Sequence, residues 1–201
     1  LVEEGIEILR RAWSGEPVNF EGKRFAVGDL KITPKPNRAP RVLLGGMAPP
    51  AIDRAARIAD GFLCTGGLGM DTYVDCLKAN GKMSEEGNII LGSWAIIAED
   101  PEAEAERVGD YVLYQSNEYI RWGAFGPPDQ TPLFPDARTA IENGLYELWD
   151  ADMAVEKLSA MMEQYPQISD IHFWAQFPGE SVESGNRRMA YIAEKVLPRL
   201  R

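Results

Sequence analysis

Short apolar segments alternate with amphipathic segments along most of this chain, and that order constrains its fold more than any other feature. The side chains of the apolar segments suit burial on both faces of a sheet, and glycine or proline residues mark their ends. Strands are therefore expected at 41–44, 61–64, 88–98 and 170–177. Because a helical segment follows each of them, the pattern predicts an α/β fold with a parallel sheet.

The amphipathic segments repeat their apolar residues at helical spacing. Helices are expected at 2–13, 49–59, 71–79, 101–122, 137–146, 151–164 and 182–197. Local signals mark several of their ends. Asp100 and Pro101 are typical of a helix start, and Asn80 with Gly81 is typical of a helix end.

Residues 15–40 interrupt this alternation near the start of the chain. Two short aromatic-bearing pieces around Gly22 predict a hairpin, and the prolines that follow predict a rigid loop. We expect 15–40 to be a surface insertion in a single domain that spans residues 1–201. Residues 123–136 contain several prolines and little periodicity, and they are expected to form a second long loop.

Composition excludes several classes of function. With 45% hydrophobic and 26% charged residues the chain is expected to be globular, and no apolar run approaches the roughly 18 residues that would cross a membrane. The formal net charge is -10 and the basic residues are scattered, which argues against nucleic-acid binding. The single histidine argues against a zinc site, and two cysteines fit a reducing cytoplasm better than a disulfide framework.

Two architectures fit this alternation. Four parallel strands cannot close a barrel by themselves, so the chain is either an incomplete (β/α)8 barrel or an open, doubly wound sheet. Both place their ligands at the carboxyl ends of the strands, where the loops that lead into the helices converge. The loops after the expected strands are therefore the candidate binding segments.

The first such loop is Gly45-Gly46-Met47-Ala48, which joins a strand directly to a helix. Glycines let backbone N–H groups approach an anion, and a helix N-terminus favours negative charge. These four residues are the candidate phosphate site. The alternative is that the two glycines only form a tight turn.

The second loop begins with Cys64-Thr65-Gly66. Thr65 offers a hydroxyl and Gly66 offers open backbone, so both are candidate cofactor-binding residues. Cys64 is expected to be a small core residue, because nothing near it in the sequence would lower the pKa of its thiol. Glu99 and Asp100 follow the third strand and are expected only to start a helix.

The fourth loop follows an aromatic stretch that contains Trp174 and Phe177. These rings could wall an apolar cavity, although whichever of them faces inward is expected to pack in the interior. His172 lies within the expected strand and is interpreted as a core or barrel-wall residue. No nucleophile elbow, dinucleotide fingerprint or Walker sequence is present, so no catalytic residue can be assigned.

Taken together, several stretches resemble the C-terminal portion of the luciferase-like monooxygenase superfamily of flavin- and deazaflavin-dependent oxidoreductases. They are EILRRAWSGEPVNFEGK, the Pro34-Lys35-Pro36 loop, RVLLGGMAPPAIDRAARIADGFL and the tail FPGESVESGNRRMAYIAEKVLPRLR. Their order and spacing are more specific than any one of them. The resemblance implies the C-terminal half of a TIM (β/α)8 barrel whose N-terminal half is missing.

The resemblance also implies a cofactor, either FMN or 8-hydroxy-5-deazaflavin (coenzyme F420). Its phosphate would lie on Gly45, Gly46, Met47 and Ala48. The polar groups near the reacting ring would come from the missing half, so the catalytic residues are unknown and this chain is expected to be inactive alone. A small-molecule substrate, a homodimer or other homo-oligomer, and a separate flavin reductase are the partners that the resemblance suggests.

Two other functions compete with this interpretation. One is a non-catalytic half-barrel module that dimerises and binds a phosphorylated ligand. The other is a phosphosugar lyase or isomerase that uses the same glycine turn. The hairpin and the Pro34-Lys35-Pro36 loop favour the oxidoreductase, since neither competitor needs them.

Overall fold

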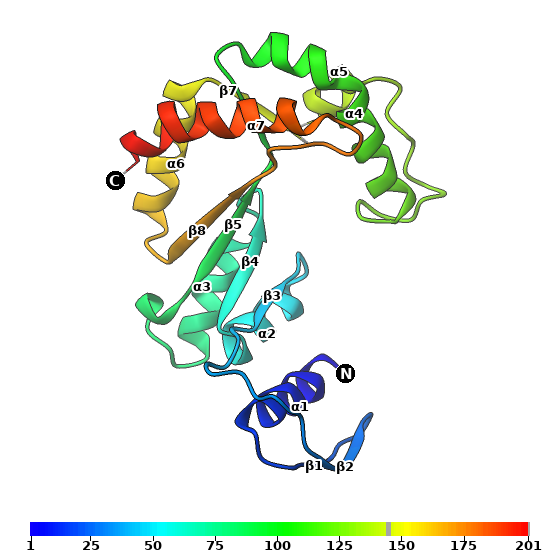
Figure 1. Cartoon of the computed structure of the whole chain (residues 1–201), viewed down its shortest axis with the longest axis vertical. Coiled ribbons are helices and arrows are strands. Elements are labelled where there is room, and N and C mark those ends of the chain that lie inside the picture. Colours follow the sequence, from blue (N-terminus) through cyan, green and yellow to red (C-terminus); the bar gives the residue numbers. More distant parts are fainter. Residues whose placement is uncertain (144–145, 201) are drawn as a thin grey trace. The chain divides into compact units, whose positions relative to one another are not determined.

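A computed structural model describes residues 1–143 and 146–200, and the contacts within it divide the chain into two compact units. The first unit comprises Leu1–Leu63 and Gly69–Ile89, and the second comprises Cys64–Leu68 and the chain from Ile90 onward. Figure 1 labels the elements of both units. Within the described residues, no helix is long and apolar enough to cross a membrane.

The first unit contains helices, a hairpin and the beginning of a parallel sheet. In order, its elements are α1 (Val2–Ser14), β1 (Val18–Glu21), β2 (Ala26–Leu30), β3 (Leu43–Gly45), α2 (Pro49–Ile58), β4 (Gly61–Thr65), α3 (Met70–Ala79) and a 3-10 turn (Ser84–Glu86). Strand β4 continues into the second unit at Cys64. The helices at 2–13, 49–59 and 71–79 and the strand at 61–64 agree with the sequence predictions to within one residue at each end.

The expected hairpin is present, and one carboxylate ties it to α1. Strands β1 and β2 pair antiparallel, and Glu4 accepts the backbone N–H groups of Lys23, Arg24 and Phe25 at 2.9 to 3.1 Å. These hydrogen bonds, that of Arg24 first, lower the pKa of Glu4. The hairpin therefore has a fixed attachment to the helix in addition to its own ladder.

Parallel pairing of β3 with β4 positions the glycine turn of the first unit. Leu43 pairs with Gly61, and Gly45 pairs with Leu63. Asp60 sets this register at the start of β4, because its carboxylate accepts the Val42 N–H at 2.7 Å while its own N–H donates to the Val42 carbonyl at 2.8 Å. The core beneath the pair includes buried side chains of α2, β4 and α3, namely Ile52, Ala55, Ala56, Phe62, Tyr73 and Leu77.

The second unit contains the remaining strands and helices. In order, its elements are β5 (Ile89–Ser93), β6 (Ala95–Ile97), α4 (Pro101–Arg121), α5 (Ala137–Glu142), β7 (Glu147–Trp149), α6 (Ala151–Gln164), β8 (Ile168–Phe173) and α7 (Val182–Tyr191). A π turn (Ile192–Val196) and a 3-10 turn (Leu197–Arg199) extend α7. Strand β5 lies between the end of β4 and β8, whereas β6 pairs in parallel with β7.

Three predictions about this unit are wrong in detail. The strand expected at 88–98 is two strands, because the chain changes sheet at Trp94. Strand β7 was not predicted at all, since three residues carry no periodicity. The helix expected at 137–146 ends at Glu142, and residues 144–145 of that prediction lie outside the described part of the chain.

The last strand also differs from its prediction. Strand β8 ends at Phe173 rather than at residue 177. The N–H of Phe177 donates at 3.0 Å to the carboxylate of Glu180, which belongs to the loop leading into α7. The Glu180 side chain therefore accepts the Phe177 N–H, which would have donated to a neighbouring strand if β8 had continued to that residue.

Side-chain caps explain why the helices of the second unit begin where they do. In each of four helices the N-cap side chain accepts an N–H of the first turn. These caps are Asp100, Asp136, Asp150 and Ser181. The prediction that Asp100 starts a helix is confirmed.

A buried ion pair joins α7 to the loop before it. The side chains of Glu180 and Arg188 are 1% and 3% exposed, and the two terminal guanidinium nitrogens of Arg188 donate to the Glu180 carboxylate, Nη1 at 2.7 Å. Arg188 also binds Glu104 of α4 at 2.6 Å and donates to the Ala175 carbonyl at 2.6 Å. Burial raises the pKa of Glu180, but hydrogen bonds from Arg188, Ser184 and the Phe177 N–H outweigh it and lower the pKa to about 2.

We expect Glu180→Gln to lower the free energy of unfolding by about 3 kcal/mol at pH 7, because it leaves the buried Arg188 without its main counter-charge. Urea denaturation measures this change. The folded-state pKa lies below the ordinary value of 4.5, so this stabilisation is complete above about pH 4.5 and is lost as the pH falls toward 2. In the Glu180→Gln variant, the free energy of unfolding should not show this loss between about pH 4.5 and 2.

The matched control is Glu142→Gln. Glu142 pairs with Arg138, and the two side chains are 63% and 88% exposed. Screening by water makes such a pair worth less than about 0.5 kcal/mol. Equal losses in the two variants would contradict the role assigned to the buried pair.

Candidate functional site

The turn from Gly45 to Ala48 connects β3 to α2 in the first unit, as predicted. Gly45, Met47 and Ala48 are exposed, and the side chain of Met47 is 66% exposed. A Cβ on Gly46 would lie 2.6 Å from the Cβ of Ala51, so only glycine lets the chain pass this close to the helix. The turn therefore presents backbone at its two glycines, and the one large side chain that it exposes is that of Met47.

The amino end of α2 carries an uncompensated positive dipole. Among the α-helices of the described residues, α2 alone has neither a side-chain cap nor an acidic residue in its first turn. Every other α-helix has at least one of the two, which offsets the partial positive charge at the helix start. An anion bound at the Gly45–Ala48 turn would supply that compensation here.

The donors at this turn differ from those of an ordinary helix start. Pro49 and Pro50 have no N–H, and the N–H groups of Ala51 and Ile52 both donate to the Ala48 carbonyl. Within the described chain, no group accepts a hydrogen bond from the N–H of Met47 or Ala48. Met47 and Ala48 are thus the residues that offer open donors to an anion.

Thr65 and Gly66 belong to the second unit, at the carboxyl end of β4. Both are exposed, and no atom lies within 4 Å of the position that a Cβ on Gly66 would occupy. The N–H of Gly66 already donates to the Gly92 carbonyl at 2.8 Å. The Gly66 N–H is therefore already used, and the Thr65 hydroxyl is the group that these two residues can offer to a ligand.

Cys64 behaves as predicted from the sequence. Its side chain is 1% exposed, and its Sγ lies 3.4 Å from the Leu68 carbonyl. Burial raises the pKa of the thiol to about 11, although a backbone hydrogen bond from Gly67 lowers it in part. The thiol is therefore a structural group and not a nucleophile.

His172 lies one residue before the end of β8 and is exposed, so of the two expected positions, core or barrel wall, the core position is wrong and the barrel wall stays a prediction. The strand ends sooner than predicted, which moves this residue from mid-strand to the strand's end. Within the described residues, no cluster of three or more His, Cys, Asp or Glu side chains could hold a metal ion.

Five aromatic side chains form a cluster in the second unit, and we refer to them as the aromatic cluster. They are Trp94, Tyr119, Tyr146, Trp174 and Phe177, and the centroids of contacting rings lie 5.3 to 5.8 Å apart. Tyr146 and Phe177 are 2% exposed, whereas Trp174 is 38% exposed. Phe177 packs in the interior, as expected of whichever of Trp174 and Phe177 faces inward, and the suggestion that these rings wall a cavity stays a prediction.

The sequence interpretation did not include Trp94, Tyr119 or Tyr146. Trp94 directly follows β5 and Trp174 directly follows β8, so both lie at the carboxyl ends of neighbouring strands. Treating 88–98 as one strand hid Trp94 in its interior. The break in the strand at Trp94 is visible only in the structure, so no sequence signal identified this residue.

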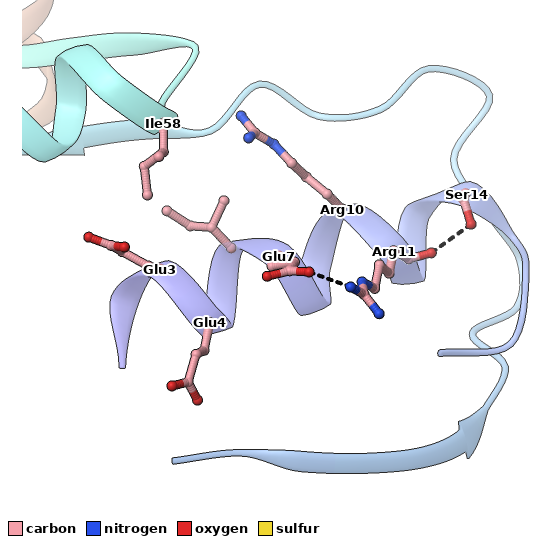
Figure 2. A pocket seen from close by; sticks show the side chains of 8 residues that line it. Glu3, Glu4, Glu7, Arg10, Arg11, Ser14 and Ile58 are labelled. Atoms are coloured by element: carbon pink, nitrogen blue, oxygen red, sulfur yellow. Dashed lines mark hydrogen bonds and ion pairs between the residues drawn. The ribbon is translucent and has the colours of Figure 1, made fainter. Parts of the chain in front are cut away.

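A hollow along α1 is lined mainly by charged side chains that are already paired (Figure 2). It has a volume of about 680 Å³. Glu7 binds Arg11, Glu3 binds Arg57, and Glu4 holds the hairpin. Because these groups satisfy one another, this hollow is not a candidate ligand site.

Comparison with known proteins identifies the family. Residues 1–165 match the model of the family described as luciferase-like monooxygenase. This match spans most of the chain, and the chain therefore belongs to that family, which confirms the resemblance inferred from its sequence.

Curated relatives include both kinds of cofactor dependence. The F420-dependent glucose-6-phosphate dehydrogenase of Microbacterium testaceum is 33% identical over 211 residues, which cover 100% of this chain and 60% of that protein. The FMNH2-dependent dimethylsulfone monooxygenase of Pseudomonas fluorescens is 30% identical over 117 residues, 57% of this chain and 32% of that protein. The chain thus spans no more than about three fifths of these relatives.

Solved structures show the same fold. A monooxygenase from Streptomyces bottropensis aligns with a TM-score of 0.68 at 20% identity over 98% of this chain and 60% of that one. The coenzyme F420 dependent tetrahydromethanopterin reductase of Methanopyrus kandleri aligns with a TM-score of 0.67 at 17% identity, over 100% and 63%. The chain is α/β with parallel strands, and its structural neighbours are luciferase-like TIM-barrel enzymes.

The environments of the two cysteines predict unequal thiol reactivity. At pH 8 we expect Cys64 to react with a disulfide reagent at least about tenfold more slowly than Cys76, because its pKa of about 11 leaves little thiolate and its sulfur is buried. The absorbance of the coloured thiol that the reagent releases reports the reaction rates of Cys64 and Cys76. The Cys76→Ser variant should show only the slow phase, and a fast phase in that variant would refute the assignment of Cys64 to the core.

Proposed function

We propose that this chain supplies the C-terminal half of a (β/α)8-barrel oxidoreductase that uses FMN or a deazaflavin, coenzyme F420, to act on a small-molecule substrate. Membership of the luciferase-like family supports the reaction class, since its named relatives are a dehydrogenase and a monooxygenase. Parallel strands followed by helices support the half-barrel, as does coverage of 60% to 63% of the neighbouring structures.

The observation that carries this proposal is the open turn at the start of α2. The cofactor phosphate would accept the N–H groups of Met47 and Ala48 and offset the positive end of the helix dipole. Gly45 and Gly46 would keep side chains out of its way. The turn fits a phosphate because it offers backbone donors and has no nearby acidic side chain in the first helical turn.

Thr65 and Gly66 of the second unit are proposed as further cofactor-binding residues in their own right. Thr65 would offer its hydroxyl to the cofactor, and Gly66 would leave space beside it. When bound, a flavin or deazaflavin supplies the redox chemistry itself, and the protein places it and excludes water. No residue of this chain is assigned a catalytic role.

The organisation proposed for the whole protein follows from the same assignment. Residues 1–201 would form part of one barrel domain, with 15–40 as a surface insertion. We propose that the whole protein is a homodimer or other homo-oligomer in the cytoplasm. If the cofactor is FMN, a separate flavin reductase would supply it in reduced form. The alternative phosphosugar lyase or isomerase has less support, because the named relatives are a dehydrogenase and a monooxygenase.

We predict that Met47→Asp weakens cofactor binding at least about tenfold, or roughly 1.4 kcal/mol, because it puts a carboxylate beside the bound phosphate. The intact protein is titrated with FMN and with coenzyme F420, and absorbance and fluorescence report binding. The wild type should bind one of them.

Met83→Asp is the matched control. Met83 is also 66% exposed and also lies in the first unit, and its neighbour Lys82 binds the Ala56 and Arg57 carbonyls, at the end of α2 opposite the turn. The same charge change there should leave cofactor affinity within about twofold, since water and salt screen distant surface charges. If neither cofactor binds the wild type, or if the two variants lose the same affinity, the proposed phosphate site is wrong.

A further inference from the structure

Strand β3 leads into the proposed phosphate turn, yet its own sequence specifies its register only weakly. Residues 42–44 are a valine and two leucines, so a slip of one residue would exchange one apolar side chain for another on each face of the sheet. The strand is three residues long and pairs with β4 from Leu43 to Gly45. A further interaction is therefore needed to fix where β3 lies along β4.

Asp60, directly before β4, supplies that interaction. Its Oδ2 accepts the Val42 N–H at 2.7 Å, and its own N–H donates to the Val42 carbonyl at 2.8 Å. Both hydrogen bonds join Asp60 to the same residue. They fix which residue of the first segment lies opposite the start of β4, because a slip of one residue would break both.

The carboxylate of Asp60 is held from its other side by α1. Nη2 of Arg10 binds Oδ1 at 3.2 Å, while Oδ2 accepts the Val42 N–H. The side chains of Arg10 and Asp60 are 45% and 41% exposed, so water screens their charges and the ion pair adds little stability. What β3 requires of Asp60 is thus an acceptor oxygen in one place rather than a negative charge.

The register of β3 determines where the open donors of Met47 and Ala48 lie. Residues 46–48 connect β3 to α2, which its own buried face holds in place. This connection is short, and at Gly46 a Cβ would already lie 2.6 Å from the Cβ of Ala51. A shift of β3 along β4 would therefore move the two N–H groups relative to the start of the helix.

We propose that Asp60 is a positioning residue for the cofactor phosphate, because it fixes the register of β3 and thereby places the backbone donors of Met47 and Ala48. It acts through the strand and not by contact with the cofactor. The inference rests on the proposed function, since that function places a cofactor phosphate at the Gly45–Ala48 turn.

The test compares a cofactor with its phosphate-free counterpart in the intact protein. Fluorescence titration gives the affinities for FMN and riboflavin. If the wild type binds coenzyme F420 instead, the pair is F420 and the 8-hydroxy-5-deazaflavin that carries ribitol without phosphate. The ratio of the two affinities isolates the contribution of the phosphate-bearing end. A general loss of structure would weaken both ligands and would not single out this ratio.

We expect Asp60→Ala to lower the affinity ratio at least about fivefold, because the Val42 N–H loses its acceptor and β3 is no longer fixed. Asp60→Asn should keep the ratio within about twofold of the wild type, since an amide oxygen can still accept that N–H. The side chain is exposed enough for both variants to fold, and riboflavin binding checks that they do.

Arg10→Gln is the matched control. It removes the charge partner of Asp60 and leaves both hydrogen bonds to Val42 in place. The affinity ratio should stay within about twofold of the wild type, because an exposed ion pair contributes little.

Hydrogen exchange tests the same role without a cofactor. In ligand-free Asp60→Ala, the backbone N–H groups of β3 should exchange faster than in the wild type, because the strand loses a fixed end. Asp60→Asn and Arg10→Gln should exchange as the wild type does. Mass spectrometry of the peptide that contains β3 measures this rate.

The outcomes separate this inference from the proposed function. If the wild type binds neither cofactor, or binds it no more tightly than its phosphate-free counterpart, the proposed phosphate site is wrong and the role of Asp60 falls with it. If the wild type shows a phosphate contribution that Asp60→Ala leaves unchanged, only the positioning role is wrong. Equal losses in Asp60→Ala and Asp60→Asn, or in Asp60→Ala and Arg10→Gln, would overturn it as well.

Discussion

The buried pair of Glu180 and Arg188 determines how the second unit is built around the end of β8. Glu180 accepts the N–H of Phe177, and Arg188 donates to the Ala175 carbonyl, so the two charged groups hold the backbone that follows β8. Trp174, which contacts Trp94, directly precedes this held segment. A buried pair contributes little net stability, because desolvation offsets the attraction, but breaking one is costly. Its value here is that it specifies a single path for the chain.

The parts of the fold that were predictable from the sequence are those that local chemistry decides. Helix starts at Asp100 and elsewhere depend on a side chain three residues from its donor, so the sequence contains the whole interaction. The Gly45–Ala48 turn was identifiable for the same reason, because adjacent glycines between a strand and a helix indicate a tight turn whether or not it binds a ligand. The pattern could not tell that Pro49 and Pro50 remove donors there and leave those of Met47 and Ala48.

The features that escaped prediction are decided between residues far apart in the sequence. Strand β7 exists because β6 offers it a partner, and the split at Trp94 exists because the chain leaves one sheet for another. The ion cluster joins α4 to α7 across 84 residues. Trp94 and Trp174 are 80 positions apart, as their numbers show, and only the neighbouring order of β5 and β8 makes them a pair. No local pattern records such contacts, so composition and periodicity could name Trp174 but not its partners.

The turn at the start of α2 bears on the class of ligand that this chain can hold. It offers backbone donors and a positive dipole, so it favours an anion and gains nothing from an apolar body. A phosphorylated cofactor and a phosphosugar would satisfy these donors equally well, so the turn alone does not distinguish an oxidoreductase from a phosphosugar lyase or isomerase. Family membership favours the cofactor, because the named relatives are a dehydrogenase and a monooxygenase and both reactions need a redox cofactor.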